Sequence, residues 1–126
     1  MARQPLRVMY VDDEADIRTI VEFALEDEAD IVLQLCGSGQ QALEQLSGFK
    51  PDLILMDVMM PGLDGPSTLQ RLQQQPDAAP TVFVTAKVQP HEIEQFKAMG
   101  AMDVLGKPFD PMALADYVRQ LGNRLP

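Results

Sequence analysis

Short apolar runs alternate with amphipathic stretches along the whole chain. The apolar runs predict five β-strands, at residues 6–11, 31–35, 53–56, 81–84 and 102–105. The third run, Leu-Ile-Leu-Met, has no polar alternation and is typical of a strand that is covered on both faces. It stops at Asp57, an acidic residue at the end of an otherwise apolar segment.

The stretches between and after these runs carry apolar residues at helical spacing and predict five helices. The third and the last helix have favourable N-caps, Asp64 and Asp110, and Pro111 follows the second of these caps. We expect the second helix to close near Gly48 and the fourth at Gly100, because glycine is common at helix C-termini.

The alternation of strands and helices predicts an α/β fold. Its sheet would be doubly wound, with five parallel strands, helices on both faces and right-handed crossovers. In such a fold the loops that follow the carboxyl ends of the strands come together at one edge of the sheet. The side chains directly after the strands are therefore the candidates for a functional site.

Composition narrows the class of protein. The chain has 126 residues, enough for one domain with its own core, and 46% of them are hydrophobic. The formal net charge of −9 argues against direct binding to nucleic acid. No apolar run approaches the roughly 20 residues that cross a bilayer, so we expect no membrane insertion. A single cysteine, Cys36, and an N-terminus without a signal-peptide pattern favour a cytoplasmic protein.

The residues that follow the strands form one candidate site. The first strand is followed by Asp12 and Asp13, the third by Asp57, the fourth by Thr85 and the fifth, after one glycine, by Lys107. Carboxylates brought together raise one another's pKa unless a cation intervenes. Oxygen ligands that leave room for bound water are what Mg²⁺ prefers. With the ammonium of Lys107 and the hydroxyl of Thr85, the group predicts a site for Mg²⁺ and for a charged, oxygen-rich group on one carboxylate.

Each of these residues also has an ordinary structural explanation. Acids such as Asp12 and Asp13 are common at the start of a helix. Lys107 alone would be a surface lysine, and Thr85 alone a hydroxyl at the end of a strand. Asp57 is harder to explain in this way, because an unpaired carboxylate at the end of an apolar strand is costly. The joint arrangement, more than any one residue, favours a functional site.

At these positions the chain resembles the receiver domains of two-component response regulators, of the single-domain, chemotaxis-Y-like type. The matching motifs are Asp12-Asp13, the segment 55–65 around Asp57, Thr85-Ala86 and Lys107-Pro108-Phe109. They occur in order, and the likeness covers essentially the whole chain. We expect one receiver domain at 5–125, with no output domain in this chain. The resemblance implies a flavodoxin-like three-layer sandwich with strand order 2-1-3-4-5.

The resemblance also implies a role for each acidic residue. Asp57 would be the nucleophile that takes a phosphoryl group from a phosphohistidine on a sensor histidine kinase or a histidine phosphotransfer protein. Asp13 and Asp57 would bind Mg²⁺ directly, with the backbone carbonyl of Met59 as a third protein ligand. Asp12 would act mainly through water, and Mn²⁺ could replace Mg²⁺. The domain would be a signalling switch rather than an enzyme, although it assists its own phosphorylation and dephosphorylation.

The remaining motif residues would bind and report the phosphoryl group. Lys107 would pair with it, aimed inward by a cis bond before Pro108, and Thr85 would hydrogen-bond to it after transfer. Many receivers place Tyr or Phe three residues before the lysine, where the ring turns inward with the threonine, but this chain has Val104. Valine has no ring to turn and is stiff at χ1. The switch must therefore be read differently by the downstream protein, which the sequence does not identify.

Several alternatives depend on particular residues. A phosphatase of the haloacid dehalogenase type needs a second Asp two residues after the nucleophile, where this chain has Met59. A flavodoxin-like electron carrier would bind the flavin phosphate at the loop that carries Asp12 and Asp13, which would repel it. The chain could also be a receiver excised from a hybrid histidine kinase or a longer response regulator. A binding module that works without phosphorylation would not need the intact set of acids, hydroxyl and lysine.

Overall fold

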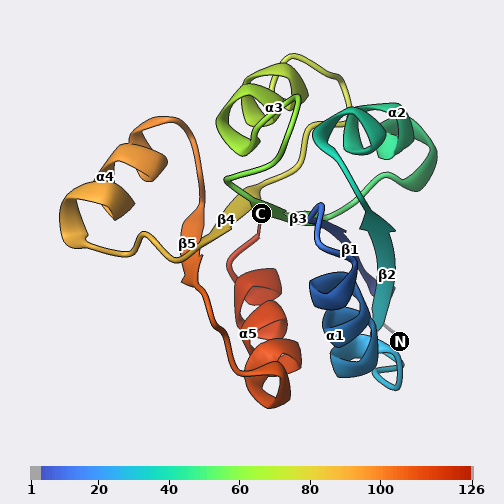
Figure 1. The fold of residues 1–126 in the computed structure, drawn as a ribbon. Coiled ribbons are helices and arrows are strands. Elements are labelled where there is room, and N and C mark those ends of the chain that lie inside the picture. Colours follow the sequence, from blue (N-terminus) through green and yellow to red (C-terminus); the bar gives the residue numbers. More distant parts are fainter. Residues whose placement is uncertain (1–3, 126) are drawn as a thin grey trace.

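Five parallel strands form one sheet, in the order β2-β1-β3-β4-β5 (Figure 1). The computed structural model describes residues 4–125. The strands are β1 (Leu6–Val11), β2 (Ile31–Cys36), β3 (Leu53–Asp57), β4 (Thr81–Thr85) and β5 (Asp103–Gly106). The helices are α1 (Ala15–Leu25), α2 (Gly39–Phe49), α3 (Gly65–Leu72), α4 (Pro90–Ala98) and α5 (Pro111–Asn123). The predicted fold class and strand order are confirmed.

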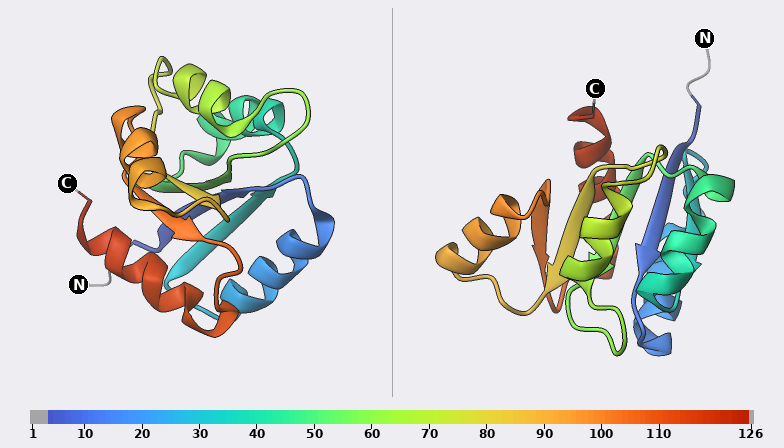
Figure 2. Two further views of the ribbon diagram at one scale, coloured as in Figure 1. Left: turned by 60° about the vertical axis from the view of Figure 1, so that its left-hand side comes forward. Right: turned by 90° about the horizontal axis from the view of Figure 1, so that it is seen from above.

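The sheet is the middle of three layers, with α2, α3 and α4 on one face and α1 and α5 on the other (Figure 2). Strand β1 contributes to both sides, because Met9 and Val11 pack toward α2 and α3 while Val8 and Tyr10 pack toward α1 and α5. Every residue of β3 and β4 is buried. The absence of polar alternation in the third run therefore predicted its environment correctly. Within residues 4–125, no helix combines the length and the apolar character that crossing a bilayer requires.

The predicted N-caps are confirmed. The Asp64 carboxylate accepts a hydrogen bond from the backbone N–H of Ser67 at 2.8 Å, at the start of α3. The Asp110 carboxylate accepts one from the N–H of Met112 at 2.9 Å, at the start of α5. Both bonds satisfy a backbone donor that the first turn of a helix leaves free, and they fix where these two helices begin.

The predicted end of α2 near Gly48 agrees with the structure to within one residue. The helix continues through Gly48 to Phe49, and the next residue, Lys50, takes the left-handed conformation with φ of 54°. The backbone N–H of Lys50 donates to the carbonyl of Leu46 at 2.8 Å, which completes the last turn. Lys50 takes the left-handed position that glycine often occupies after a helix, so Gly48 marks the end of the helix without being its left-handed residue. After α4, which ends at Ala98, the left-handed residue is Gly100, with a φ of 111°, close to the predicted end.

Candidate functional site

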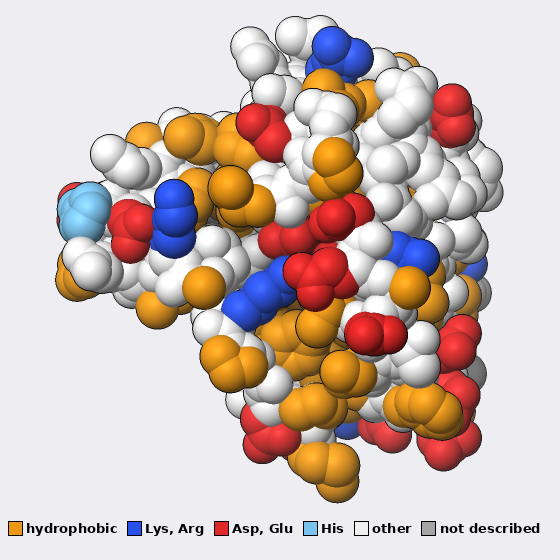
Figure 3. All heavy atoms as spheres, in the orientation of Figure 1, with side chains coloured by type: hydrophobic (Ala, Val, Ile, Leu, Met, Phe, Trp, Pro, Cys, Tyr) orange, Lys and Arg blue, Asp and Glu red, His pale blue; other side chains and the backbone are white. Residues whose placement is uncertain are grey.

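Polar side chains gather at the carboxyl edge of the sheet, directly after the strands. Strand pairing determines their positions: Val11 lies opposite Met56, so that the next residues, Asp12 and Asp57, come side by side. On the other side of β3, Asp57 lies opposite Val84 of β4. Figure 3 shows a group of acidic side chains near the centre of this face, with a basic side chain beside it.

Three aspartates form the acidic part of the site. Asp12, Asp13 and Asp57 each place a carboxylate oxygen within 4.8 Å of the others. Asp12 is completely buried, Asp57 is 5% exposed and Asp13 is exposed. The cluster is therefore open to solvent on the side of Asp13 and closed beneath Asp12.

Lys107 is a cation in direct contact with the carboxylates of this cluster. Its Nζ lies 3.1 Å from Oδ2 of Asp12 and 3.3 Å from Oδ1 of Asp57. Burial acts to lower the pKa of Lys107, but the hydrogen bond to Asp12 and the charges of both carboxylates outweigh it and raise the pKa. The bond before Pro108 is cis, and the backbone N–H of Lys107 donates to the carbonyl of Thr85 at 2.8 Å.

The charge of Asp57 is incompletely compensated. Burial and, secondly, the charge of Asp12 raise the pKa of Asp57, whereas Lys107 and the backbone N–H of Met59 lower it. Burial and the charge of Asp12 have the larger effect, so the pKa of Asp57 lies above its ordinary value. A partly open group of oxygen donors with excess negative charge fits Mg²⁺, which binds oxygen and keeps part of its water shell.

Asp12 also accepts hydrogen bonds from residues that the pattern of strand ends did not predict to be part of the site. The N–H of Glu14 donates to Oδ1 of Asp12 at 2.9 Å, and the hydroxyl of Tyr10 donates to Oδ2 at 3.5 Å. The guanidinium of Arg18 donates to the backbone carbonyl of Asp12 at 2.7 Å. Tyr10 could have been found from its spacing, because residues two apart in a strand share a face. Arg18 reaches the loop from α1, and no spacing rule predicts that contact.

Thr85, Met59 and Val104 lie around the cluster in different ways. Thr85 is 4% exposed, and its hydroxyl accepts a hydrogen bond from the backbone N–H of Lys87 at 3.1 Å. The Met59 side chain is 69% exposed. Val104 is half-buried and packs against the core on the α2, α3 and α4 side. The structure thus brings the three aspartates and Lys107 into contact and leaves the side chains of Met59 and Val104 outside the cluster.

Gly65 is a further residue that shapes the site. A Cβ at this position would lie 2.5 Å from the carbonyl oxygen of Asp57 and 2.9 Å from Cα of Val58. The backbone N–H of Gly65 also donates to the Val58 carbonyl at 2.9 Å. Only a residue without a side chain allows α3 to start this close to the end of β3.

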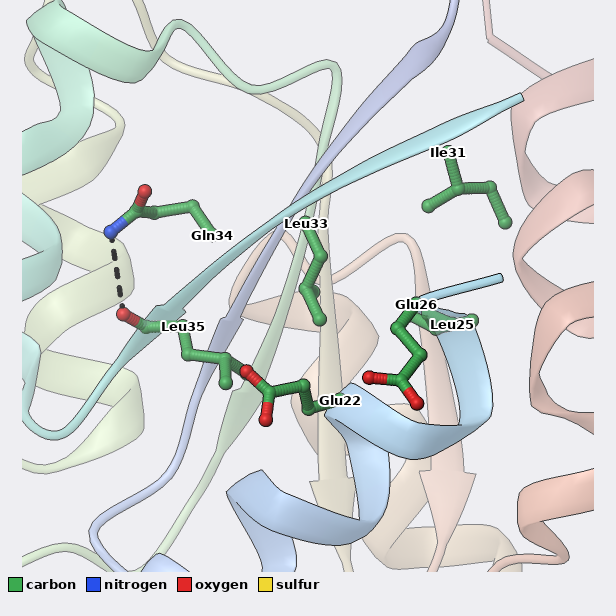
Figure 4. Close-up of a pocket in the computed structure, with 7 residues that line it drawn as sticks. All are labelled: Glu22, Leu25, Glu26, Ile31, Leu33, Gln34 and Leu35. Atoms are coloured by element: carbon green, nitrogen blue, oxygen red, sulfur yellow. Dashed lines mark hydrogen bonds between the residues drawn. The ribbon is translucent and has the colours of Figure 1, made fainter. Parts of the chain in front are cut away.

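An apolar cavity of about 310 Å³ adjoins Lys107. Its lining residues come from α1 and from the segments that follow β4 and β5, and they are Ile17, Ile20, Ala86, Lys107, Pro108, Phe109 and Pro111. Hydrophobic side chains are visible below the acidic group in Figure 3, over α1 and α5. A separate hollow of about 430 Å³ lies between α1 and β2, rimmed by the carboxylates of Glu22 and Glu26 (Figure 4). It shares no lining residue with the acidic cluster.

Comparison with known proteins gives one consistent family. The family model described as response regulator receiver domain matches residues 8–119. Response regulator Rre1 of Synechocystis is 35% identical, over 94% of this chain and 52% of its own length. The alkaline phosphatase synthesis transcriptional regulatory protein PhoP of Bacillus subtilis is 34% identical, over 94% of this chain and 49% of its own length. The chain therefore spans about half the length of these curated relatives.

Solved structures agree with this similarity. The chemotaxis response regulator CheY4 of Vibrio cholerae has a TM-score of 0.84 and 28% identity, with coverage of 94% of this chain and 99% of that one. The receiver domain of the Francisella response regulator 1452 also has a TM-score of 0.84, with 29% identity and coverage of 94% and 98%. These structures share the order of strands and helices on which the acidic cluster is built.

Proposed function

The chain belongs to the family of response regulator receiver domains, and on that premise we propose that Asp57 accepts a phosphoryl group within a two-component phosphorelay. Receiver domains act as signalling switches. The observation that carries the proposal is the contact between the buried Asp57 carboxylate and the Lys107 ammonium, at 3.3 Å, inside a cluster of three aspartates. An acceptor carboxylate with a cation already beside it can bind a group that carries two negative charges.

The transfer itself is a displacement at phosphorus. An oxygen of Asp57 forms the new bond, and the bond from phosphorus to the imidazole nitrogen of the donor histidine breaks, so that its electron pair leaves with the imidazole. Asp13 and Asp57, with Asp12 through water and the Met59 carbonyl, would hold Mg²⁺. When bound, this ion supplies positive charge to the phosphoryl oxygens.

Lys107 and Thr85 would hold the phosphoryl group after transfer. The ammonium of Lys107 is within reach of the acceptor oxygen and can pair with a phosphoryl oxygen. The hydroxyl oxygen of Thr85 already accepts a hydrogen bond from the N–H of Lys87. Among residues 4–125 this hydroxyl donates no hydrogen bond, so its own hydrogen can be donated to the phosphoryl group. Val104 is half-buried against the core on the α2, α3 and α4 side, and valine has no ring, so a rotating ring at this position is not part of the proposed switch.

The donor would be a sensor histidine kinase or a histidine phosphotransfer protein. The apolar cavity beside Lys107 supports a protein donor, because it offers a surface for apolar side chains next to the acceptor. Direct contact with DNA is not part of the proposal, since the net charge is −9. A cytoplasmic location belongs to the same proposal, and the free, buried thiol of Cys36 is compatible with a reducing compartment.

The proposal is tested by incubating the protein with acetyl phosphate and Mg²⁺ and measuring its intact mass. We expect one added phosphoryl group, which is lost when the metal is chelated and in Asp57→Asn. The matched control is Asp27→Asn, which should leave uptake unchanged. Asp27 is an exposed aspartate that lies two residues after the end of α1. Equal uptake in Asp57→Asn and in the unsubstituted protein would refute the assignment.

A further inference from the structure

The carboxylate of Asp12 is completely buried, and both of its oxygens accept hydrogen bonds from protein groups. Oδ1 accepts from the backbone N–H of Glu14 at 2.9 Å. Among the residues described, the two side chains that donate to Oδ2 are Lys107, at 3.1 Å, and Tyr10, at 3.5 Å. One buried oxygen is thus shared between an ammonium, which also contacts Asp57, and a phenol.

The two donors are not equivalent. The Lys107 bond has an ordinary length, whereas 3.5 Å is long for an O–H···O bond, which is normally about 2.5–3.0 Å. Tyr10 is itself completely buried, and its ring packs edge-on against Phe109 with centroids 6.5 Å apart. The phenol is therefore held in place beneath the cluster, with its hydroxyl close to Oδ2 of Asp12, to which Lys107 donates the shorter hydrogen bond.

Phosphorylation of Asp57 would change which group the Lys107 ammonium pairs with. The proposed function, on which this step rests, requires the ammonium to pair with the phosphoryl group on Asp57. Oδ2 of Asp12 then loses its 3.1 Å partner. Asp12 is completely buried, and a buried carboxylate oxygen that loses a hydrogen-bond donor is costly.

We propose that Tyr10 is a positioning residue that replaces Lys107 as the main hydrogen-bond donor to Oδ2 of Asp12. When Lys107 turns to the phosphoryl group, the hydrogen bond from the Tyr10 hydroxyl to this oxygen shortens. Tyr10 does not touch the phosphoryl group. It acts through Asp12, by keeping the buried carboxylate paired in the phosphorylated state and so making the movement of Lys107 less costly. A tyrosine that only fills the core would stabilise both states equally and would not affect the binding of a phosphoryl group.

The chain offers a matched pair of substitutions to test this role. Tyr10→Phe removes the hydroxyl and keeps the ring against Phe109. Tyr117→Phe removes the other tyrosine hydroxyl, which donates to Asp103 at 3.3 Å, at the start of β5. The probe is beryllofluoride with Mg²⁺, which mimics the phosphoryl group, and its bound fraction is measured by ¹⁹F NMR.

We expect Tyr10→Phe to weaken beryllofluoride binding about fivefold, the effect of weakening one hydrogen bond to a charged group. Binding in Tyr117→Phe should stay within about twofold of the unsubstituted protein. Equal binding in both variants and the unsubstituted protein would overturn the role of Tyr10 and leave the proposed function intact. No beryllofluoride binding to the unsubstituted protein would overturn both.

A second readout observes the phenol directly. The sequence has no tryptophan and two tyrosines, so in Tyr117→Phe the tyrosine emission comes from Tyr10 alone. A phenol that donates to a carboxylate loses emission, and we expect the Tyr10 signal to fall when beryllofluoride binds. Unchanged emission in a sample that ¹⁹F NMR shows to be loaded would contradict a closing bond between Tyr10 and Asp12.

Discussion

At the residue scale, the site places more negative than positive charge in a partly buried position. Asp57 is 5% exposed, and burial together with the neighbouring Asp12 raises its pKa despite the contact with Lys107. Lys107 divides its ammonium between two carboxylates, at 3.1 and 3.3 Å. The charge arrangement around the proposed acceptor, Asp57, therefore lowers the stability of the unmodified fold when no metal ion is bound.

This cost predicts that Asp57→Asn stabilises the protein in buffer with a metal chelator. Removing the charge relieves repulsion with Asp12 and leaves Lys107 to pair with that carboxylate alone. We expect the free energy of unfolding in urea to rise by about 1–2 kcal/mol, the scale on which buried polar groups act. The exposed control Asp27→Asn should change it by less than about 0.5 kcal/mol. A lower free energy of unfolding for Asp57→Asn would show that Lys107 compensates the carboxylate fully.

The core of the site could be predicted because its residues directly follow strands. Asp12, Asp57 and Lys107 are each found by locating the end of an apolar run, and strand pairing then brings them into contact. Their roles as nucleophile, metal ligand and phosphoryl partner stay predictions. Tyr10 and Arg18 were not predicted, because an aromatic residue in a strand and a basic residue on a helix have many ordinary explanations.

At the element scale, the turn from β3 into α3 determines how Asp57 is presented. Asp64 caps the helix, and Gly65 lets its first turn lie against the carbonyl of Asp57. A side chain at residue 65 would meet backbone atoms, which cannot rotate away as a flexible side chain can. The position of Asp57 thus depends on a glycine, which has no reactive side chain of its own.

We expect Gly65→Ala to lower the free energy of unfolding by about 1–3 kcal/mol, as overpacking does, and to reduce phosphoryl uptake from acetyl phosphate. The matched control is Gly48→Ala, which places the same methyl group inside α2 with nothing within 4 Å. That change should raise the free energy of unfolding by about 0.5–1 kcal/mol, because alanine favours helix over glycine. If both variants behaved alike, the close contact at residue 65 would not constrain the turn.

Element boundaries show where the sequence pattern stops being informative. The caps at Asp64 and Asp110 were predictable, because a short side-chain acceptor at a helix start has one dominant use. The end of α2 was predicted near Gly48 and lies at Phe49, but the left-handed residue that follows the helix is Lys50, which the sequence pattern did not indicate. The backbone N–H of Lys50 completes the last turn of α2 by donating to the carbonyl of Leu46, and no single residue type indicates such a contact.

At the scale of the whole molecule, two apolar cores on opposite faces hold the fully buried strands β3 and β4 between them. The ends of these strands carry Asp57 and Thr85, so the site is built on the most buried part of the fold. The alternation of elements was enough to predict this architecture. Cys36, at the end of β2, is part of the core on the α2, α3 and α4 side, and burial raises the pKa of its thiol to about 11.

The buried thiol predicts a pH dependence of stability. In the unfolded chain the thiol has a pKa of about 9, so between pH 9 and 11 it ionises in the unfolded state but not in the folded one. Its contribution is fully present below pH 9 and is lost as the pH rises to about 11. The loss of unfolding free energy over this range should be smaller by about 2 kcal/mol in Cys36→Ala, measured by urea denaturation at each pH. Parallel pH profiles for the two proteins would mean that the folded thiol ionises normally.

The central claim is that Asp57, and neither of the neighbouring aspartates, carries the phosphoryl group. Borohydride reduces an aspartyl phosphate to homoserine, so treatment after incubation with acetyl phosphate and Mg²⁺ marks the acceptor permanently for peptide mass spectrometry. We predict homoserine at residue 57, with Asp12 and Asp13 unchanged. Homoserine at residue 12 or 13, or no reduced residue in a protein whose mass shows the added phosphoryl group, would contradict the account.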